Sequence, residues 1–281
     1  MEALLRRGAS ARLVAFSRQP DGAAARRLRE RGVEVRPGDL ADRASLERLF
    51  AGAGAVFGVT QPWSPGYKKV DAPGEIAQGR NIVDACRAAG VAHLVLTTAM
   101  QLEDKASGIP HIDSKQEIER HLRASGQPFT LLRPAMFIEN IGMPFFPVKR
   151  GTLRGFVDAD AKLPFVAARD VGEAAAVALT APGEWLGRTV DLVSDFVSGD
   201  DVVRYLERAH PGRKYRYTCP PRLLMRLFAK EFYKMRVGAE VAGRPPFPHR
   251  EGIERAMQQT RAMVPGFLSV EQHVMALPLP S

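Results

Sequence analysis

The feature that most constrains this chain is a repeated unit: a short apolar segment, a helical pattern and then a glycine. The apolar segments are residues 13–16, 54–59, 93–97 and 129–132, and residues 33–36 are read as a further short strand. Apolar runs without polar alternation are typical of strands buried on both faces of a parallel sheet. The repetition therefore predicts parallel βαβ units with right-handed crossovers, and so an α/β fold of the doubly wound, Rossmann-like kind.

The regular alternation of predicted strands and helices stops after Pro134, where prolines and glycines divide the chain into shorter pieces. We predict a Rossmann-like dinucleotide-binding domain over residues 1–135. A smaller, mostly helical substrate or partner region over residues 136–281 would be interleaved with the sheet and cover its mouth. The helices expected there are Arg169–Thr180, Asp200–Ala209 capped by Ser198, Pro221–Gly238 and His249–Met263.

The chain is basic, with a net charge of +9 and a pI near 9.9 over 281 residues. Its basic residues are scattered, and the densest group is Arg213–Arg236. No DNA-reading motif accompanies them, so solvated helix faces or a phosphate-bearing small ligand are favoured over nucleic acid.

The cysteines, the histidines and the length of the apolar runs argue against three classes of protein: disulfide-rich, metal-binding and membrane-spanning. Cys86 and Cys219 lie far apart in the sequence, which argues against a disulfide framework and fits a reducing cytoplasm. The six histidines show no metal-binding spacing. No apolar run approaches the ~20 residues of a membrane span, so no membrane partner is expected.

Ligands of open parallel sheets bind beyond the carboxyl ends of the strands. Ser17 and Arg18 follow the first apolar segment, with no acidic residue before Asp21. An acidic residue at this place reads the 2′-hydroxyl of NAD, whereas an arginine accommodates the 2′-phosphate of NADP. The sequence therefore favours NADP, with a solvated turn arginine as the alternative reading of Arg18.

The strand-end segments together resemble those of the NmrA-like family of atypical short-chain dehydrogenases/reductases. The matching pieces are SRQP, GDLAD, VTQPW, HLVLTTA, HIDSKQEIE, LLRPAMFIENI and ARDVGEAA, and they extend to a closing VPGFLSVEQHV. Each piece alone is weak, but their order and spacing are specific. The resemblance covers essentially the whole chain.

This resemblance implies a set of site residues. Arg18 would bind the 2′-phosphate, beside Ser17, and the nicotinamide ribose would lie near Lys115. Thr98 falls where classical relatives carry a catalytic serine, and His111 falls where they carry a tyrosine that donates a proton. The remaining residues are Asp39 and Leu40 beside the adenine, Thr60, Gln61 and Pro62 along the sugars, and Trp63, Phe137, Glu139 and Asn140 on the substrate side.

Lys115 is also unusual on its own terms. The predicted helix 113–124 places it in the first turn, where the helix dipole disfavours a cation. Ser114 and Glu117 in the same turn match a capping box. An unfavourable lysine at this place indicates a ligand contact, and a flexible surface lysine is the alternative.

The family's glycine-rich GxxGxxG loop, which follows its first strand, is absent from this sequence. Such a loop supplies the backbone amides that hold the pyrophosphate. About 20 residues would be needed for the strand and its turn. Either the start codon is misassigned, which we favour, or the chain is a truncated pseudo-enzyme without cofactor.

The expected function is NADPH-dependent reduction of a small carbonyl, quinone or enone. The alternative is a non-catalytic, NADP(H)-sensing regulator that binds a protein partner, since the tyrosine is missing. The sequence leaves the oligomeric state open.

Overall fold

A computed structural model of the chain describes residues 1–8, 11–63, 70–101 and 106–278. They form two compact units. Unit 1 contains residues 1–99, 110–132 and 175–189, and unit 2 contains residues 100–109, 133–174 and 190–281. The division into domains at residue 135 stays a prediction.

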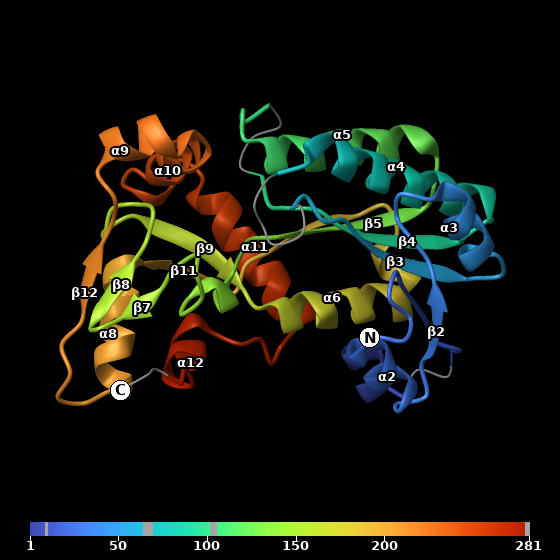
Figure 1. Cartoon of the computed structure of the whole chain (residues 1–281), viewed down its shortest axis with the longest axis horizontal. Coiled ribbons are helices and arrows are strands. Elements are labelled where there is room, and N and C mark those ends of the chain that lie inside the picture. Colours follow the sequence, from blue (N-terminus) through green and yellow to red (C-terminus); the bar gives the residue numbers. More distant parts are fainter. Residues whose placement is uncertain (9–10, 64–69, 102–105, 279–281) are drawn as a thin grey trace. The chain divides into compact units, whose positions relative to one another are not determined.

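The larger sheet has the parallel strands expected from the sequence. Its order is β10 (Thr189–Leu192), β5 (Phe129–Pro134), β4 (His93–Thr97) and β3 (Ala55–Val59), and unit 1 contains β3, β4, most of β5 and only the first residue of β10. Strand β4 pairs in parallel with β3 and with β5 (Figure 1). Every residue of β4 is buried, because the strand is central and covered on both faces.

A second, two-stranded sheet lies in the same unit. It consists of β1 (Val14–Ser17) and β2 (Glu34–Pro37), which pair in parallel. Within the described residues, no strand joins this pair to β3. Val14 on β1 and both Phe57 and Val59 on β3 are exposed, although apolar residues in parallel strands are usually covered.

Three helices of unit 1 lie side by side on one face of the larger sheet (Figure 1). They are α3 (Arg43–Phe50), α4 (Ala72–Ala88) and α5 (Pro110–Ser125), and two short helices, α1 (Glu2–Arg6) and α2 (Ala23–Arg29), lie near β1 and β2. The predicted cap of α3 is confirmed, since Asp42 accepts the backbone N–H of Ser45 at 3.1 Å. The core between helices and sheet contains Leu46, Ile82, Leu94, Leu96, Ile118, Leu122 and Leu131.

The predicted start of α5 is wrong. The helix begins at Pro110, so Ser114 lies inside it and does not cap it. Proline is favoured at the first helical position, since its fixed φ suits the helix and its missing N–H would be unpaired there anyway. Lys115 therefore lies beyond the first turn, and the helix-dipole argument for it does not apply.

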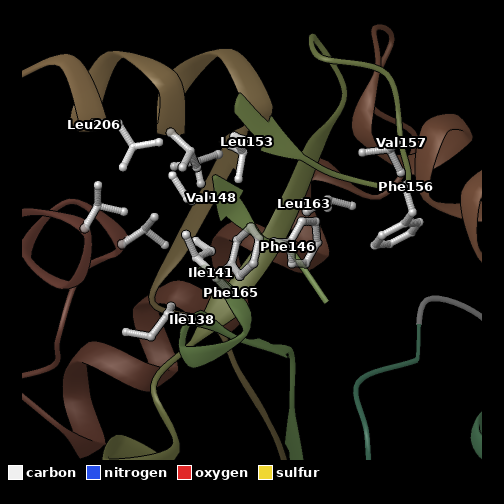
Figure 2. Packing of buried hydrophobic residues seen from close by; sticks show 14 of the residues in the cluster. Ile138, Ile141, Phe146, Val148, Leu153, Phe156, Val157, Leu163, Phe165 and Leu206 are labelled. Carbon is white, nitrogen blue, oxygen red and sulfur yellow. The ribbon is translucent and has the colours of Figure 1, made fainter. Parts of the chain in front are cut away.

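Unit 2 contains two three-stranded sheets, more strand than its sequence suggested. One has the order β11 (Asp195–Ser198), β9 (Lys162–Val166) and β6 (Met136–Phe137). The other has the order β12 (Arg216–Thr218), β8 (Thr152–Arg154) and β7 (Val148–Lys149). An apolar cluster built around Phe146, Phe156 and Phe165 packs against these strands, and Figure 2 shows these rings close to Leu163.

Three of the remaining helices, at residues 168–180, 199–209 and 250–263, follow the prediction closely, whereas those at residues 182–185 and 270–275 were not predicted. The remaining helices are α6 (Ala168–Thr180), α7 (Pro182–Trp185), α8 (Gly199–Ala209), α9 (Arg222–Phe228), α10 (Lys230–Gly243), α11 (Arg250–Met263), α12 (Val270–Met275) and the 3₁₀ turn η2 (Ile138–Asn140). Ser198 caps α8 as predicted, within a full capping box. The single helix predicted over Pro221–Gly238 is wrong, because the backbone of Ala229 leaves the helical region and separates α9 from α10.

Two further observations concern the chain as a whole. Cys86 is buried, Cys219 is half-buried, and both are free thiols. Among the described residues, no helix combines the length and apolar character that crossing a membrane requires.

Candidate functional site

A buried polar cluster lies at the carboxyl end of β3. It consists of Thr60, directly after the strand, Glu75 on α4, and Ser114 and Lys115 on α5, and is called the Lys115 cluster below. The Nζ atom of Lys115 lies 2.5 Å from Oε1 of Glu75 and donates to Oγ1 of Thr60 at 2.6 Å. The Glu75 side chain is fully buried and that of Lys115 is 8% exposed. The Thr60 and Ser114 hydroxyls donate to the two Glu75 oxygens at 2.8 and 2.5 Å.

The close approach of α4 and α5 explains why these groups meet. A Cβ atom on Gly79 would lie 2.5 Å from the Ile118 side chain, so only glycine allows the two helices this spacing. Glu75 precedes Gly79 by four residues, and Ser114 precedes Ile118 by four. Residues four apart share a helix face, so the Gly79–Ile118 contact places Glu75 against Ser114 one turn earlier.

The pKa of Lys115 is shifted by its position in the cluster. Burial lowers the pKa of Lys115 below its ordinary value, and the Glu75 carboxylate opposes this without cancelling it. Removing an ammonium group from water is costly, so a buried lysine with a single carboxylate partner is sensitive to any further ligand. The alternative of a flexible surface lysine is wrong, since Lys115 is buried.

A second buried pair lies at the end of β4. The hydroxyl of Thr98 donates to Oε1 of Glu119 at 2.6 Å, and both side chains are buried. Arg123 lies 3.9 Å from the other oxygen of Glu119. Because the Thr98 proton is already donated, its oxygen has only acceptor capacity left.

Two of the predicted residues stack on one another. The rings of Trp63 and His111 have centroids 5.8 Å apart and planes 33° apart. His111 is the second residue of α5, one turn before Lys115, and is half-buried. The neighbouring Pro62 is buried and its carbonyl accepts the N–H of Asp71 at 2.7 Å, while Gln61 is exposed.

The residues predicted to bind the adenosine half of the cofactor lie after β1 and β2. Ser17 ends β1, and its hydroxyl accepts the backbone N–H of Gln19 at 3.0 Å. Arg18 is exposed directly after it. Asp39 and Leu40 follow β2; the Asp39 carboxylate accepts the N–H of Ala41 at 3.0 Å, and the Leu40 side chain packs against the core.

The remaining predicted residues belong to unit 2. Phe137 ends β6 and is exposed, while Glu139 and Asn140 lie in η2 and are half-buried. The Glu139 carboxylate accepts the N–H of Ala168 at 3.0 Å. The roles assigned from the sequence to these residues, and to those of unit 1, stay predictions.

Two acidic residues of this region were missed. Glu75 and Glu119 are buried and bind the predicted residues Lys115 and Thr98 directly. A signal existed for Glu75: it shares a helix face with Gly79 in the segment that reads most clearly as an amphipathic helix. Its partner lies 40 positions further along the chain, so the sequence pattern alone did not reveal the contact.

Polar groups gathered after the strands of a parallel sheet lie where open α/β proteins bind their ligands. The model of the NmrA-like family matches residues 1–272, so the chain belongs to this family. It is 29% identical over 225 residues to the NmrA-like family domain-containing oxidoreductase FrzB of Cladobotryum sp.. That match covers 72% of this chain and 67% of the relative.

Solved structures share the fold. The Citrobacter sp. triphenylmethane reductase complexed with NADP(H) has a TM-score of 0.75 at 21% identity, covering 97% of this chain and 93% of its own. NmrA, a negative transcriptional regulator, has a TM-score of 0.76 at 20% identity, covering 98% and 91%.

Proposed function

We propose that the chain is an NADPH-dependent reductase of a small carbonyl, quinone or enone. The observation that carries this proposal is the burial of Lys115 at the carboxyl end of β3, where, among the described residues, its ammonium group contacts the Glu75 carboxylate and the Thr60 hydroxyl. Ligands of parallel sheets bind at such ends. The reductase and the oxidoreductase among the similar proteins support the same class of reaction. The two free thiols suit a reducing cytoplasm, which is part of the proposal.

The donor set of unit 1 fits a phosphate-bearing dinucleotide. An exposed guanidinium follows β1 at Arg18, where NADP-binding folds contact the 2′-phosphate. The ammonium group of Lys115 on α5 supplies a further donor beside Thr60, directly after β3. Bound NADPH would supply hydride to the acceptor.

The protein's own groups would hold and polarise the reactants. Lys115 would bind the nicotinamide ribose, with Glu75 and Thr60 fixing the direction of its Nζ atom. The His111 ring carries an N–H group, so it could donate a proton to the acceptor. Thr98 would help to position the substrate to be reduced, while its hydroxyl continues to donate its proton to the Glu119 carboxylate.

A second candidate is a non-catalytic regulator that senses NADP(H) and binds a protein partner. The bond from Thr98 to Glu119 favours it, because a hydroxyl that already donates to a carboxylate is a poor donor to a substrate carbonyl. A regulator among the similar folds agrees with this candidate. A third outcome is a pseudo-enzyme that does not bind the cofactor.

One experiment separates the three. NADPH binding is measured by fluorescence titration of the purified chain, and NADPH oxidation is then followed against a panel of quinones and enals. The reductase proposal expects binding and turnover with at least one acceptor. Binding without turnover would replace it with the regulator, and absent binding with the pseudo-enzyme.

The NADP preference is tested at Arg18. Arg18→Asp is expected to weaken NADPH binding at least tenfold and NADH binding little, because a bond between charged groups contributes about 1.5–3 kcal/mol. Titrations with both cofactors measure the difference, and Arg48→Asp, on the exposed side of α3, is the matched control. Equal losses for the two cofactors would refute the assignment of Arg18 to the 2′-phosphate.

A further inference from the structure

The densest basic segment of the sequence carries an exposed apolar face that the proposed reductase site does not use. In α9, the side chains Leu223, Leu224, Leu227 and Phe228 are 65%, 50%, 59% and 83% exposed. Contiguous exposed apolar side chains of this size mark interaction sites more often than chance. Together with Arg226 and Lys230 they are called the α9 surface.

Helix geometry gathers these side chains on one side. At about 100° per residue, positions 223, 224, 227 and 228 occupy one arc of roughly 140°. Met225 lies outside this arc and is buried in the core cluster of unit 2, so it anchors the helix. Phe228 is the last residue of α9, at the corner where the chain turns into α10 (Figure 1). The apolar arc is therefore presented outward from a firmly held helix.

The charges around the arc are of one sign. Arg226 borders it on the helix and Lys230 follows it, and both are exposed. Four further exposed cations lie in the same part of the chain, Arg213, Lys214, Arg216 and Lys234, whereas Arg222 is paired with Glu240. The only acidic residue in positions 211–239 is Glu231. The partner of this surface must therefore offer negative charge beside an apolar phase.

We propose that the α9 surface binds anionic membrane surfaces. Leucine and phenylalanine on one side of a helix, with lysine and arginine beside them, is the composition of helices that lie in a lipid interface. The long basic side chains can keep their charges among lipid headgroups while their stems contact the apolar layer. A seven-residue helix is only about 10 Å long, so the attachment is shallow and reversible. Attachment of this kind does not need a transmembrane helix.

Other occupants fit the surface less well. A second copy in a twofold interface would bring Arg226 and Lys230 against the same cations, since such an interface is self-complementary. A folded protein partner would be expected to meet tryptophan, tyrosine and arginine anchors, and leucine is under-represented among such anchors. The α9 surface has three leucines and no tryptophan or tyrosine.

The test is cosedimentation of the full chain with vesicles. The wild type is expected to pellet with phosphatidylcholine vesicles that contain about 30% phosphatidylglycerol, and to pellet little with pure phosphatidylcholine. It is expected to be released at about 0.5 M NaCl, because the screening length is then only about 4 Å. Arg226→Glu combined with Lys230→Glu is expected to weaken binding roughly thirtyfold, from about fivefold per cation. Leu227→Ser combined with Phe228→Ser is expected to weaken it at least tenfold (roughly 1.5–3 kcal/mol per buried side chain).

Matched controls make the test specific to this surface. Arg87→Glu combined with Arg255→Glu changes the net charge equally at exposed positions elsewhere, and Met275→Ser removes another exposed apolar side chain. Both are expected to bind like the wild type. The proposal is overturned if the wild type does not pellet with anionic vesicles, or if the charge control weakens binding as much as the α9 pair. A dimer that the Leu227→Ser and Phe228→Ser pair dissociates, measured by light scattering, would assign the surface to a second copy instead.

Discussion

Each unit buries an ionic cluster, and the two clusters differ in composition. The Lys115 cluster of unit 1 has one cation and one carboxylate, joined by two hydroxyls. In unit 2, Arg236 is buried and lies 2.7 Å from Glu240 on the same helix. Its guanidinium also contacts Asp158 and donates to the Pro220 carbonyl at 2.7 Å. Arg222 and Arg244 supply further cations, and these five charged residues are called the Arg236 cluster.

The pKa of the central cation is shifted in opposite directions in the two clusters, because one cation is an arginine and the other is a lysine. Burial is the largest influence and acts to lower the pKa of Arg236, but the hydrogen bond to Glu240 and the nearby negative charges together outweigh it, so the net shift is upward. For Lys115 burial prevails and the pKa falls. Arginine stays charged and uses its five donors on fixed acceptors, whereas a buried lysine is more easily neutralised or recruited by a ligand.

The comparison shows that a buried ion pair is not by itself a sign of a functional site. The Arg236 cluster links α9 and α10 to the loop at Asp158, and each acid in it has a second arginine. The Lys115 cluster lies after a strand of a parallel sheet and has no second cation among the described contacts of Glu75. We therefore interpret the first as structural and the second as the centre of the candidate site.

The largest effect is expected from Lys115→Met. It leaves Glu75 ionised and buried without a cation, which costs about 3–5 kcal/mol of folding free energy. Urea denaturation at neutral pH measures the loss. Adding Glu75→Gln to this variant is expected to restore most of the stability. A double variant no more stable than the single one would show that the pair is not coupled.

A smaller effect is expected from Arg236→Met. Glu240 keeps Arg222 and Asp158 keeps Arg244, so the loss is about 1.5–3 kcal/mol, the contribution of hydrogen bonds to a charged group. Unfolding in urea measures it, with Arg255→Met on exposed α11 as the control. If Arg236→Met lost more free energy of unfolding than Lys115→Met, the Arg236 cluster and not the Lys115 cluster would be the more sensitive to loss of its cation.

The smallest effect is expected at Asp195, a partly buried acid of unit 2 whose carboxylate accepts the N–H of Val270 at 2.6 Å. Burial raises its pKa, so the folded state binds the proton more tightly than the unfolded state. The stability that this group contributes is therefore complete below about pH 3.9 and declines as the pH rises through the raised value.

Asp195→Asn keeps an acceptor oxygen and removes this decline. At pH 7 it is expected to stabilise the chain by up to about 1 kcal/mol, and at pH 3 to change little. Thermal unfolding across this pH range measures the difference, with exposed Asp21→Asn as control. A destabilised variant at pH 7 would show that the charge on Asp195 is compensated.

Local sequence was sufficient for several of the elements. The five residues of β4 were predicted with their bounds, because its apolar centre, Leu94 to Leu96, lies between turn signals and is typical of a buried strand. The caps at Asp42 and Ser198 were predicted for a similar reason, since a capping side chain bonds backbone only three residues away. The alternation of these elements also predicted the parallel sheet.

Tertiary structure decided the site. The sequence placed Lys115 in a first turn, but α5 begins at Pro110 and turns Lys115 and Ser114 towards Glu75 on another helix. That contact depends on the close packing of Gly79 against Ile118, across 39 positions of the chain. Contacts over such separations leave no periodic signal, because they are fixed by how elements pack and not by neighbours along the chain. The sequence by itself determined which strands and helices form and where their ends offer polar groups, and packing alone decided that Lys115 would be buried against Glu75.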